Sequence, residues 1–335
     1  MMKESKKNMK KQFKSKLVKA PSVEHWGVRG KPYRILIVSD LHVGSSTAIC
    51  SERPVISDLG TTYNPNALQK QFLRAWKDMI KDLDGPIDLL VVNGECIDGA
   101  NVKQVGQQSW STNLEDQMND AKKLIEMIPY KEVMLLRGSN YHDQIDGTNF
   151  EEIMASKLRN VRKYKAYGGQ GATDYFAFVE IHGKIFNFTH HIGYSKAESN
   201  RTGALAKEMK GMHFQHDTLG RADVFIRSHA HYFVHVEFAN THGCITPAWK
   251  FPDAHLFRGG LSGTVPDIGA VGFDVYKDGT IEFVKYIAQV PMKANVVHLG
   301  KRKKPKKKRS KKSKKKRRSR NLRSGKFTKK IGKKP

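Results

Sequence analysis

Carboxylates, imidazoles and one amide gather in five short segments of this chain, and each segment directly follows an apolar, β-branched run. The segments are residues 39–42, 93–98, 137–143, 189–191 and 228–231. Oxygen atoms and imidazole nitrogens are ligands of hard or borderline divalent cations, whereas thiolates suit softer metals. A metal centre is therefore the first hypothesis that the sequence supports.

The elements that must position these side chains alternate along the first half of the chain. Strands are expected at residues 35–38, 89–92 and 133–136, and helices at residues 66–83 and 113–128. This alternation predicts an α/β fold. Because strand ends in open α/β sheets collect binding groups, the polar segments are expected to converge.

The second half of the chain is richer in strands. Residues 185–188 and 224–226 precede the last two polar segments, and a third helix is expected after Gly203. Strand pairs are expected at residues 175–181 with 184–189, 232–238 with 243–246, and 271–276 with 280–286 across a Lys-Asp-Gly turn. This half is expected to be mostly antiparallel. Two sheets that face each other, with helices outside, would bury both sets of strands.

The charge of the chain is concentrated at its two ends. The formal net charge is +28, yet residues 1–20 hold eight Lys against one Glu, and residues 301–335 hold 22 Lys and Arg with no acid. The part between them is close to neutral. These changes in charge along the sequence predict a basic arm at residues 1–20, one domain at residues 21–300 and a disordered basic tail at residues 301–335.

Several classes of protein are excluded by composition. Cys50, Cys96 and Cys244 are odd in number and show no C-x-x-C spacing, which argues against a disulfide framework or a zinc ribbon. The lysine-rich N-terminus does not read as a secretory signal, and no run approaches the roughly 18 apolar residues of a membrane span. The expectation is an intracellular, cytoplasmic protein whose tail is compatible with nucleoid or nuclear association.

The five segments together resemble the motifs of the calcineurin-like metallophosphoesterase superfamily. In order, these motifs are D-x-H, G-D-x-x-D, G-N-H-D/E, a lone His after a strand, and G-H-x-H. The similarity extends over about residues 33 to 235. It implies a metal-dependent phosphoesterase with a four-layer α/β/β/α sandwich of two mixed sheets.

Two adjacent divalent metal ions are implied by this resemblance. One would be held by Asp40, His42 and His231, and the other by Asn140, His190 and His229. Glu95 would bridge the two. Manganese is the working expectation for the metals, with iron or zinc as alternatives, because mixed His, carboxylate and amide ligands do not select one metal.

Acid–base roles are also implied by the resemblance. His142 would donate a proton to the leaving group, and Asp143 would steady it. Asp98 would support the ligands without binding a metal. Two cations would neutralise the phosphate charge and generate metal-bound hydroxide for in-line attack.

The sequence departs from the family pattern at several positions. Glu95 stands where the family usually has Asp, and Ser228 stands in place of Gly. Ser139 and Tyr141 interrupt the compact Gly-Asn-His of the third motif. His190 is followed by His191, and His190 is preferred as the ligand because it directly follows the strand.

Simpler interpretations exist for single residues. One buried His is more often a hydrogen-bonded core residue than a ligand, but five segments at strand ends favour a metal. Glu95 and Asp98 could instead be a charge pair at the N-terminus of a helix, where negative charge interacts favourably with the helix dipole. Asn140 could form a turn. Two interpretations also exist for Arg137 and Arg227: each could contact a phosphate or form a structural ion pair. An inactive, metal-binding relative of an enzyme is a further alternative.

The basic ends suggest a polyanionic partner. A dense run of Lys and Arg binds phosphates without reading sequence, and no aromatic side chain interrupts residues 301–320. The leading hypothesis is a two-metal phosphodiesterase or nuclease that acts on nucleic acid. The alternatives are a phosphomonoesterase acting on proteins or small molecules, and a nucleic-acid-binding protein with a structural metal site. The sequence makes no prediction of oligomeric state.

Overall fold

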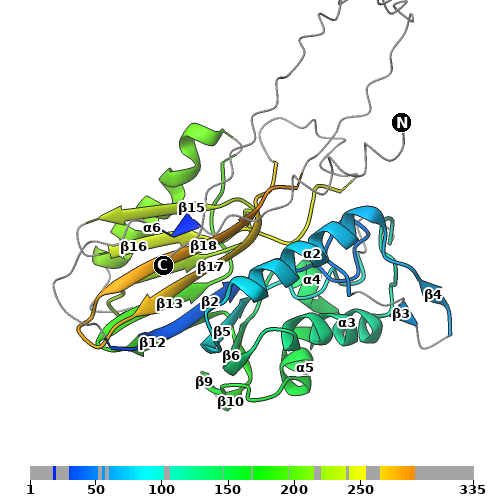
Figure 1. The fold of residues 1–335 in the computed structure, drawn as a ribbon, viewed down its shortest axis with the longest axis horizontal. Coiled ribbons are helices and arrows are strands. Elements are labelled where there is room, and N and C mark those ends of the chain that lie inside the picture. Colours follow the sequence, from blue (N-terminus) through cyan, green and yellow to red (C-terminus); the bar gives the residue numbers. More distant parts are fainter. Residues whose placement is uncertain are drawn as a thin grey trace, which may run out of the picture. The chain divides into compact units, whose positions relative to one another are not determined.

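The structure of the chain is a computed structural model, shown in Figure 1. It describes residues 18–19, 30–51, 55–56, 60–101, 106–145, 147–166, 169–195, 197–214, 220–238, 241–253 and 265–290. The domain limits predicted at residues 20 and 300, and the basic tail at residues 301–335, lie outside these residues and stay predictions.

One of the two large sheets has seven strands, in the order β1-β18-β17-β2-β5-β6-β11. Its members are β1 (Val18–Lys19), β2 (Tyr33–Val38), β5 (Ile87–Asn93), β6 (Tyr130–Leu136), β11 (Thr173–Asp174), β17 (Ile268–Val275) and β18 (Ile281–Ala288). The neighbouring strands β2, β5, β6 and β11 run parallel to one another. Their near-continuous apolar runs suit a sheet that is covered on both faces.

A five-stranded sheet has the order β12-β13-β14-β16-β15. Its members are β12 (Phe176–Ile181), β13 (Lys184–Thr189), β14 (Val224–Arg227), β15 (Val234–Phe238) and β16 (Thr241–Ile245). The expected hairpins β12–β13 and β15–β16 are confirmed as antiparallel pairs.

The expectation that the second half is mostly antiparallel is confirmed for its three hairpins but does not hold for β14. β14 pairs in parallel with both β13 and β16. Parallel neighbours need a crossover, and α6 (Arg201–Phe214) supplies it between β13 and β14. The last hairpin, β17–β18, joins the seven-stranded sheet, where β17 pairs antiparallel with β2.

The two expected helices of the first half are confirmed as α2 (Ala67–Asp82) and α3 (Leu114–Glu126). Asn66 and Asn113 cap them by accepting backbone N–H bonds. A further helix, α5 (Phe150–Lys157), was not expected from the sequence, and Asn149 caps it in the same way. Among the described residues, no helix has the length and apolarity to cross a membrane.

The remaining elements are short. They are β3 (Val55–Ile56), β4 (Thr62–Tyr63), α4 (Asn140–Asp143), β7 (Gln144–Ile145), β8 (Thr148–Asn149), β9 (Tyr164–Ala166), β10 (Gly169–Gly171) and a 3-10 turn at Glu198–Asn200.

Three apolar clusters show that the fold has four layers. In the first, Phe72 and Trp76 of α2 pack with Leu90 of β5. In the second, Ile37 of β2 and Phe186 of β13 lie between the two sheets. The third cluster joins the five-stranded sheet to α6, where Leu205 and Met209 are buried. Figure 1 shows α6 beside β15 and β16, apart from α2, α3 and α5. The expected α/β/β/α sandwich is confirmed.

Candidate metal centre

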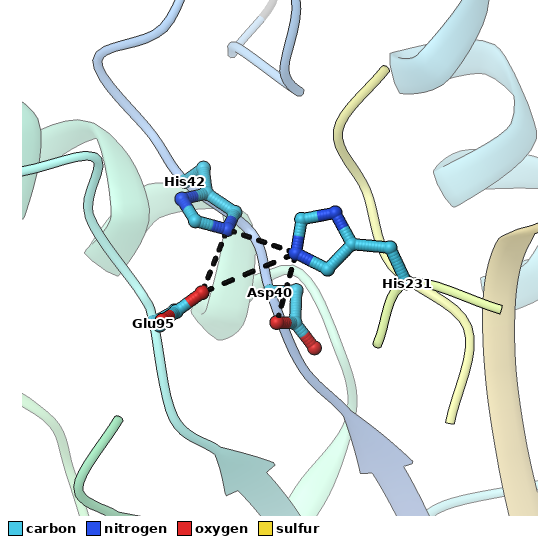
Figure 2. A group of neighbouring side chains, drawn as sticks. All are labelled: Asp40, His42, Glu95 and His231. Atoms are coloured by element: carbon cyan, nitrogen blue, oxygen red, sulfur yellow. Dashed lines mark hydrogen bonds and ion pairs between the residues drawn. The ribbon is translucent and has the colours of Figure 1, made fainter. Parts of the chain in front are cut away.

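Six side chains of the polar segments meet where four strands end. Asp40 and His42 follow β2, Glu95 follows β5, His190 follows β13, and His229 and His231 follow β14. We call these six residues the candidate centre. Figure 2 shows four of them, Asp40, His42, Glu95 and His231, pointing toward one another. Carboxyl ends of parallel strands share one edge of a sheet, which explains the convergence.

The backbone of the candidate centre is unusual. Nine non-glycine residues in the described part of the chain have positive φ, and five of them are Asp40, His42, Glu95, His229 and His231. This left-handed conformation is unfavourable for residues with a Cβ atom. Such conformations persist where the surrounding structure holds them, and they cluster at functional sites.

Gly94 allows the β5 loop to approach His190. Its φ is +83°, and a Cβ atom at this position would overlap the ring of His190 and lie 2.8 Å from the Cα of Gly138. Only glycine fits this position, because any side chain would displace the imidazole that follows β13.

One group of ligand-type atoms surrounds His231. Its Nε2 atom lies 3.2 Å from Asp40 Oδ1 and 3.3 Å from His42 Nε2. His42 Nε2 in turn lies 2.8 Å from Glu95 Oε2. All four side chains present one ligand atom within 4.8 Å of the others.

A second group lies on the other side of Glu95. His190 Nε2 is 3.3 Å from Glu95 Oε1, and His229 Nδ1 is 3.7 Å from the same oxygen. His190 Nδ1 donates to the carbonyl of Asn93 at 2.7 Å, which leaves Nε2 directed into the group. Glu95 therefore presents one carboxylate oxygen to each group.

Three buried atoms test whether a metal fits here. Asp40 Oδ1, His190 Nε2 and His229 Nδ1 have no hydrogen-bond partner among the described residues. Buried polar atoms without partners are rare and costly in folded proteins. Carboxylate oxygen and imidazole nitrogen are ligands of zinc, manganese and iron, so this donor set fits divalent cations.

The charges of the candidate centre also favour cations. Burial raises the pKa of Asp40 and Glu95, but neighbouring imidazoles, including His231 for Asp40 and His142 for Glu95, outweigh it and lower both values. Burial opposes protonation of the histidines, yet the carboxylates raise the pKa of His190 to about 10 and that of His231 to about 9. Buried carboxylates thus hold positive charge at this place.

The third motif folds differently from its compact family form. Ser139 Oγ donates to Glu95 Oε1 at 2.6 Å, while Asn140 is exposed at the start of α4. The structure therefore brings Ser139, which directly follows Gly138, against the carboxylate, and it does not bring Asn140 there. Ser139 thus takes the position after Gly138 that Asn has in the compact motif.

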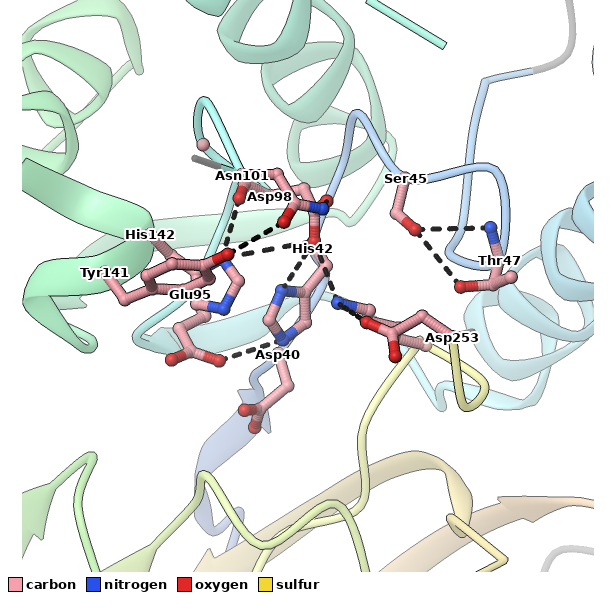
Figure 3. Close-up of polar contacts among 12 residues, drawn as sticks. Asp40, His42, Ser45, Thr47, Glu95, Asp98, Asn101, Tyr141, His142 and Asp253 are labelled. Atoms are coloured by element: carbon pink, nitrogen blue, oxygen red, sulfur yellow. Dashed lines mark hydrogen bonds and ion pairs between the residues drawn. The ribbon is translucent and has the colours of Figure 1, made fainter. Parts of the chain in front are cut away.

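His142 lies beside Asp98 (Figure 3). Its Nδ1 atom donates to the Asp98 carbonyl at 2.7 Å, and the Asp98 carboxylate is 4.0 Å away. Burial lowers the pKa of His142 to about 4, and the pull of Glu95 does not reverse this. The side chain of Asp143 lies outside the described part, so its predicted role stays a prediction.

Asp98 makes two further contacts that sequence reasoning did not find. Its Oδ1 atom accepts a hydrogen bond from Lys250 Nζ at 2.9 Å and lies 3.3 Å from His42 Nδ1. Burial raises the pKa of Asp98, but Lys250 outweighs it and lowers the pKa well below its usual range. Lys250 is only 7% exposed. A lone lysine between Trp249 and Phe251 was the one sequence signal for a buried cation.

Glu151 of α5 is the second functional residue that the sequence did not reveal. It is fully buried and accepts the backbone N–H groups of Gly138 (2.7 Å) and Cys96 (3.3 Å). It therefore ties together the two loops that carry Ser139 and Glu95. The signal was present as a capping Asn149 followed by two acidic residues.

Ser228, which stands in place of the family's glycine, makes side-chain contacts that a glycine could not make. Its hydroxyl accepts a hydrogen bond from Asn93 Nδ2 and contacts Thr246 Oγ1, both at 2.7 Å. These bonds connect the ends of β5, β14 and β16. The serine thus helps to hold the two sheets in register at the candidate centre.

Arg137 and Arg227 both make the structural ion pairs that were one of their two interpretations. Arg137 pairs with Glu152, and Arg227 pairs with Glu208 of α6. His191 is exposed, with its ring 4.8 Å from that of His229.

A pocket of about 220 Å³ opens onto the candidate centre. His42, Glu95, His142 and Lys250 form its polar side. The lining also includes the largely apolar residues Tyr194, Tyr232, Pro252, Val265 and Pro266. A polar group near the imidazoles could therefore be bound together with an apolar neighbour.

A two-sheet sandwich with histidines and carboxylates at its strand ends defines the class of metal-dependent hydrolases. The chain matches the family model of the calcineurin-like phosphoesterases over residues 33–244, and it belongs to this family. It is a metal-dependent phosphoesterase.

Several solved structures resemble the chain at low sequence identity. Vps29 from Entamoeba histolytica in complex with zinc is 11% identical, with a TM-score of 0.31 over 76% of this chain and 98% of that chain. An archaeal phosphodiesterase is 14% identical, with a TM-score of 0.35 over 75% and 99%. Vps29 from Chaetomium thermophilum is 10% identical, with a TM-score of 0.35 over 77% and 100%. No curated protein sequence matches.

Proposed function

We propose that this chain hydrolyses phosphodiester bonds of nucleic acid with two divalent cations bound on either side of Glu95. The observation that carries the proposal is that Glu95 presents one oxygen to each of two ligand groups. Asp40, His42 and His231 would hold one cation, and His190 and His229 the other. Asn140 is left out because its side chain is exposed.

The bound cations would supply charge neutralisation at the phosphate and lower the pKa of water toward neutrality. The residues of the chain do the rest. His142 commits Nδ1 to the Asp98 carbonyl, so Nε2 is the atom that serves the leaving oxygen. The negative charge of a phosphate would raise the pKa of His142 from about 4 toward its working range.

The choice of nucleic acid depends on the charge at the two ends of the chain. Residues 301–335 alone hold 22 Lys and Arg. Such a segment binds phosphate polymers and raises their local concentration near the domain.

A phosphomonoesterase is the second candidate, and one observation favours it. Lys250 is a buried cation on the polar side of the pocket, beside His42 and His142. A third positive group suits the dianionic phosphate of a monoester better than the single charge of a diester.

One assay separates these functions. The full chain, a chain that ends at Gly300, Asp40→Asn and His191→Gln are assayed with Mn²⁺, before and after chelation. The substrates are para-nitrophenyl phosphate, its bis ester, single- and double-stranded DNA, RNA and a phosphopeptide. We expect cleavage of the diester and of nucleic acid that is lost with chelator and in Asp40→Asn, and that is kept in His191→Gln.

The comparison of chains then tests the substrate. Removal of the tail should weaken cleavage of polymers and leave the bis ester unaffected. Turnover of monoesters alone would favour the phosphomonoesterase, and equal activity of Asp40→Asn and the parent chain would contradict the metal mechanism.

A further inference from the structure

The β15–β16 hairpin carries three side chains of ligand type that lie outside the candidate centre. Glu237 and His242 stand directly opposite each other in the antiparallel register, and His235 pairs with Cys244 two positions along. Successive side chains of a strand point to opposite faces, so His235 and Glu237 share one face. His242 is on that same face, because directly paired residues are.

The distances among the three side chains fit a small divalent cation. His235 Nε2 lies 3.4 Å from His242 Nδ1, and Glu237 Oε2 lies 4.0 Å from the same nitrogen. Two ligands that bind zinc tetrahedrally at 2.0–2.1 Å are about 3.3 Å apart. The imidazole pair of the candidate centre, His42 and His231, has a similar separation of 3.3 Å.

Packing holds the two imidazoles and leaves the carboxylate free to move. The ring of His235 lies parallel to that of Phe283, with centroids 4.1 Å apart. The ring of His242 contacts Phe273, and its side chain is 15% exposed. Glu237 is 64% exposed, so a small side-chain rotation can bring its oxygen closer without disturbing the core.

The imidazoles are also in the neutral form that a metal requires. Burial, together with repulsion by His242, lowers the pKa of His235 to about 4, and burial lowers the pKa of His242. The positive charges of Lys285 and Lys184 act on these imidazoles and disfavour cation binding. The negative charge of Glu237 favours it. The two rings share a hydrogen bond between His242 Nδ1 and His235 Nε2.

We propose that His235, Glu237 and His242 form a third metal site, which takes a borderline divalent cation such as Zn²⁺, with water completing the coordination. Histidine and carboxylate ligands in this number are typical of zinc. The site spans β15, the edge strand of its sheet, and its neighbour β16. β15 begins three residues after His231, so the metal would clamp the hairpin that follows the fifth motif.

Zinc binding to the full chain tests the proposal. Metal-free protein is dialysed against Zn²⁺ and its zinc content is measured for the parent chain, His235→Ala, His242→Ala and Glu237→Gln. His182→Asn is the matched control, because His182 lies in the turn of a different hairpin. We expect each alanine variant to lose one zinc per chain relative to the parent, Glu237→Gln to bind it about tenfold more weakly, and the control to lose none.

Two further measurements keep the test decisive. Asp40→Asn with His190→Ala should retain one zinc, which separates this site from the candidate centre. Imidazole NMR signals of His235 and His242 should shift when Zn²⁺ is added to the parent chain, whatever the folding of the alanine variants. Unchanged signals, or equal zinc content and affinity in Glu237→Gln and the parent, would overturn the proposal.

Discussion

Lys250 and Asp98 form a buried ion pair beside two imidazoles of the pocket. Lys250 Nζ donates to Asp98 Oδ1 at 2.9 Å and lies 3.8 Å from Asp253. Asp98 in turn faces His42 Nδ1. The pair therefore orients a proposed ligand and places a positive charge at the pocket.

Removing the lysine alone should destabilise the protein strongly. Lys250→Met leaves Asp98 buried without its main partner, which costs about 3–5 kcal/mol for a buried pair. Lys250→Met with Asp98→Asn should cost less than the sum of the two single changes, because the uncompensated charge is gone. Urea unfolding of the four chains measures this coupling. Additive effects would show that the two residues do not interact.

Gly94 permits a steric comparison with a second glycine of similar conformation. Gly183 has φ +76° with open space around it, whereas a Cβ at Gly94 would meet His190. Gly183→Ala should cost about 1–2 kcal/mol for the left-handed backbone alone. Gly94→Ala should cost more and should also lower activity, since it displaces His190. Thermal unfolding and an ester assay check this, and equal effects of the two variants would contradict it.

At the scale of elements, α5 acts as a brace for the candidate centre. Glu151 in its first turn accepts hydrogen bonds from the loops after β5 and β6. These loops carry Glu95 and Ser139. A helix that contributes no proposed ligand thus determines where two loops of the site lie.

Glu151→Gln should therefore affect both stability and catalysis. The change replaces one of the two oxygens that accept backbone N–H bonds by an NH₂ group. This leaves one buried donor without its acceptor, which costs about 1–3 kcal/mol. We expect a loss of that size in urea unfolding and a lower kcat with bound metal unchanged. Normal kcat in Glu151→Gln would contradict the role as a brace.

Glu152, the next residue of α5, should make stability depend on pH. Burial raises its pKa, but hydrogen bonds from Thr173 and Ala172 outweigh this and lower it. Its folded pKa lies below the unfolded value, so its stabilisation is present above about pH 4.5 and is lost as the pH falls through the folded pKa.

Urea unfolding of Glu152→Gln and the parent chain between pH 6 and pH 3 measures this. The two should differ most above pH 5 and converge toward pH 3. Glu132→Gln is the control, because Glu132 forms a surface ion pair with Arg162, and such pairs contribute about 0–1 kcal/mol. A constant difference between Glu152→Gln and the parent would contradict the linkage.

At the scale of the whole molecule, charge is unevenly distributed along the sequence: residues 21–300 are nearly neutral, and residues 301–335 hold 22 Lys and Arg with no acid. If the tail neutralises six to ten phosphates, affinity for DNA should fall about 10³–10⁵-fold between 50 and 200 mM salt. Fluorescence anisotropy with labelled DNA measures the slope for the full chain and for a chain that ends at Gly300. Equal slopes would show that the tail does not bind the polymer.

Much of the fold could be predicted from local patterns. Apolar runs gave the central strands, and 3.6-residue periodicity with capping Asn66 and Asn113 gave α2 and α3. The parallel pairing of β14 and the position of β17 beside β2 could not be predicted. Pairing partners depend on which apolar faces meet, and one strand's sequence does not specify its neighbour.

The sequence by itself determined which residue types are available and that each follows a strand, because those signals are local. Only the tertiary structure decided that Glu95 lies between two ligand groups and that Ser139, not Asn140, contacts it. It also brought in Glu151, 13 residues beyond Gly138, and Lys250, 152 residues beyond Asp98. Contacts over such separations arise from packing of layers, and no short pattern in the chain encodes them.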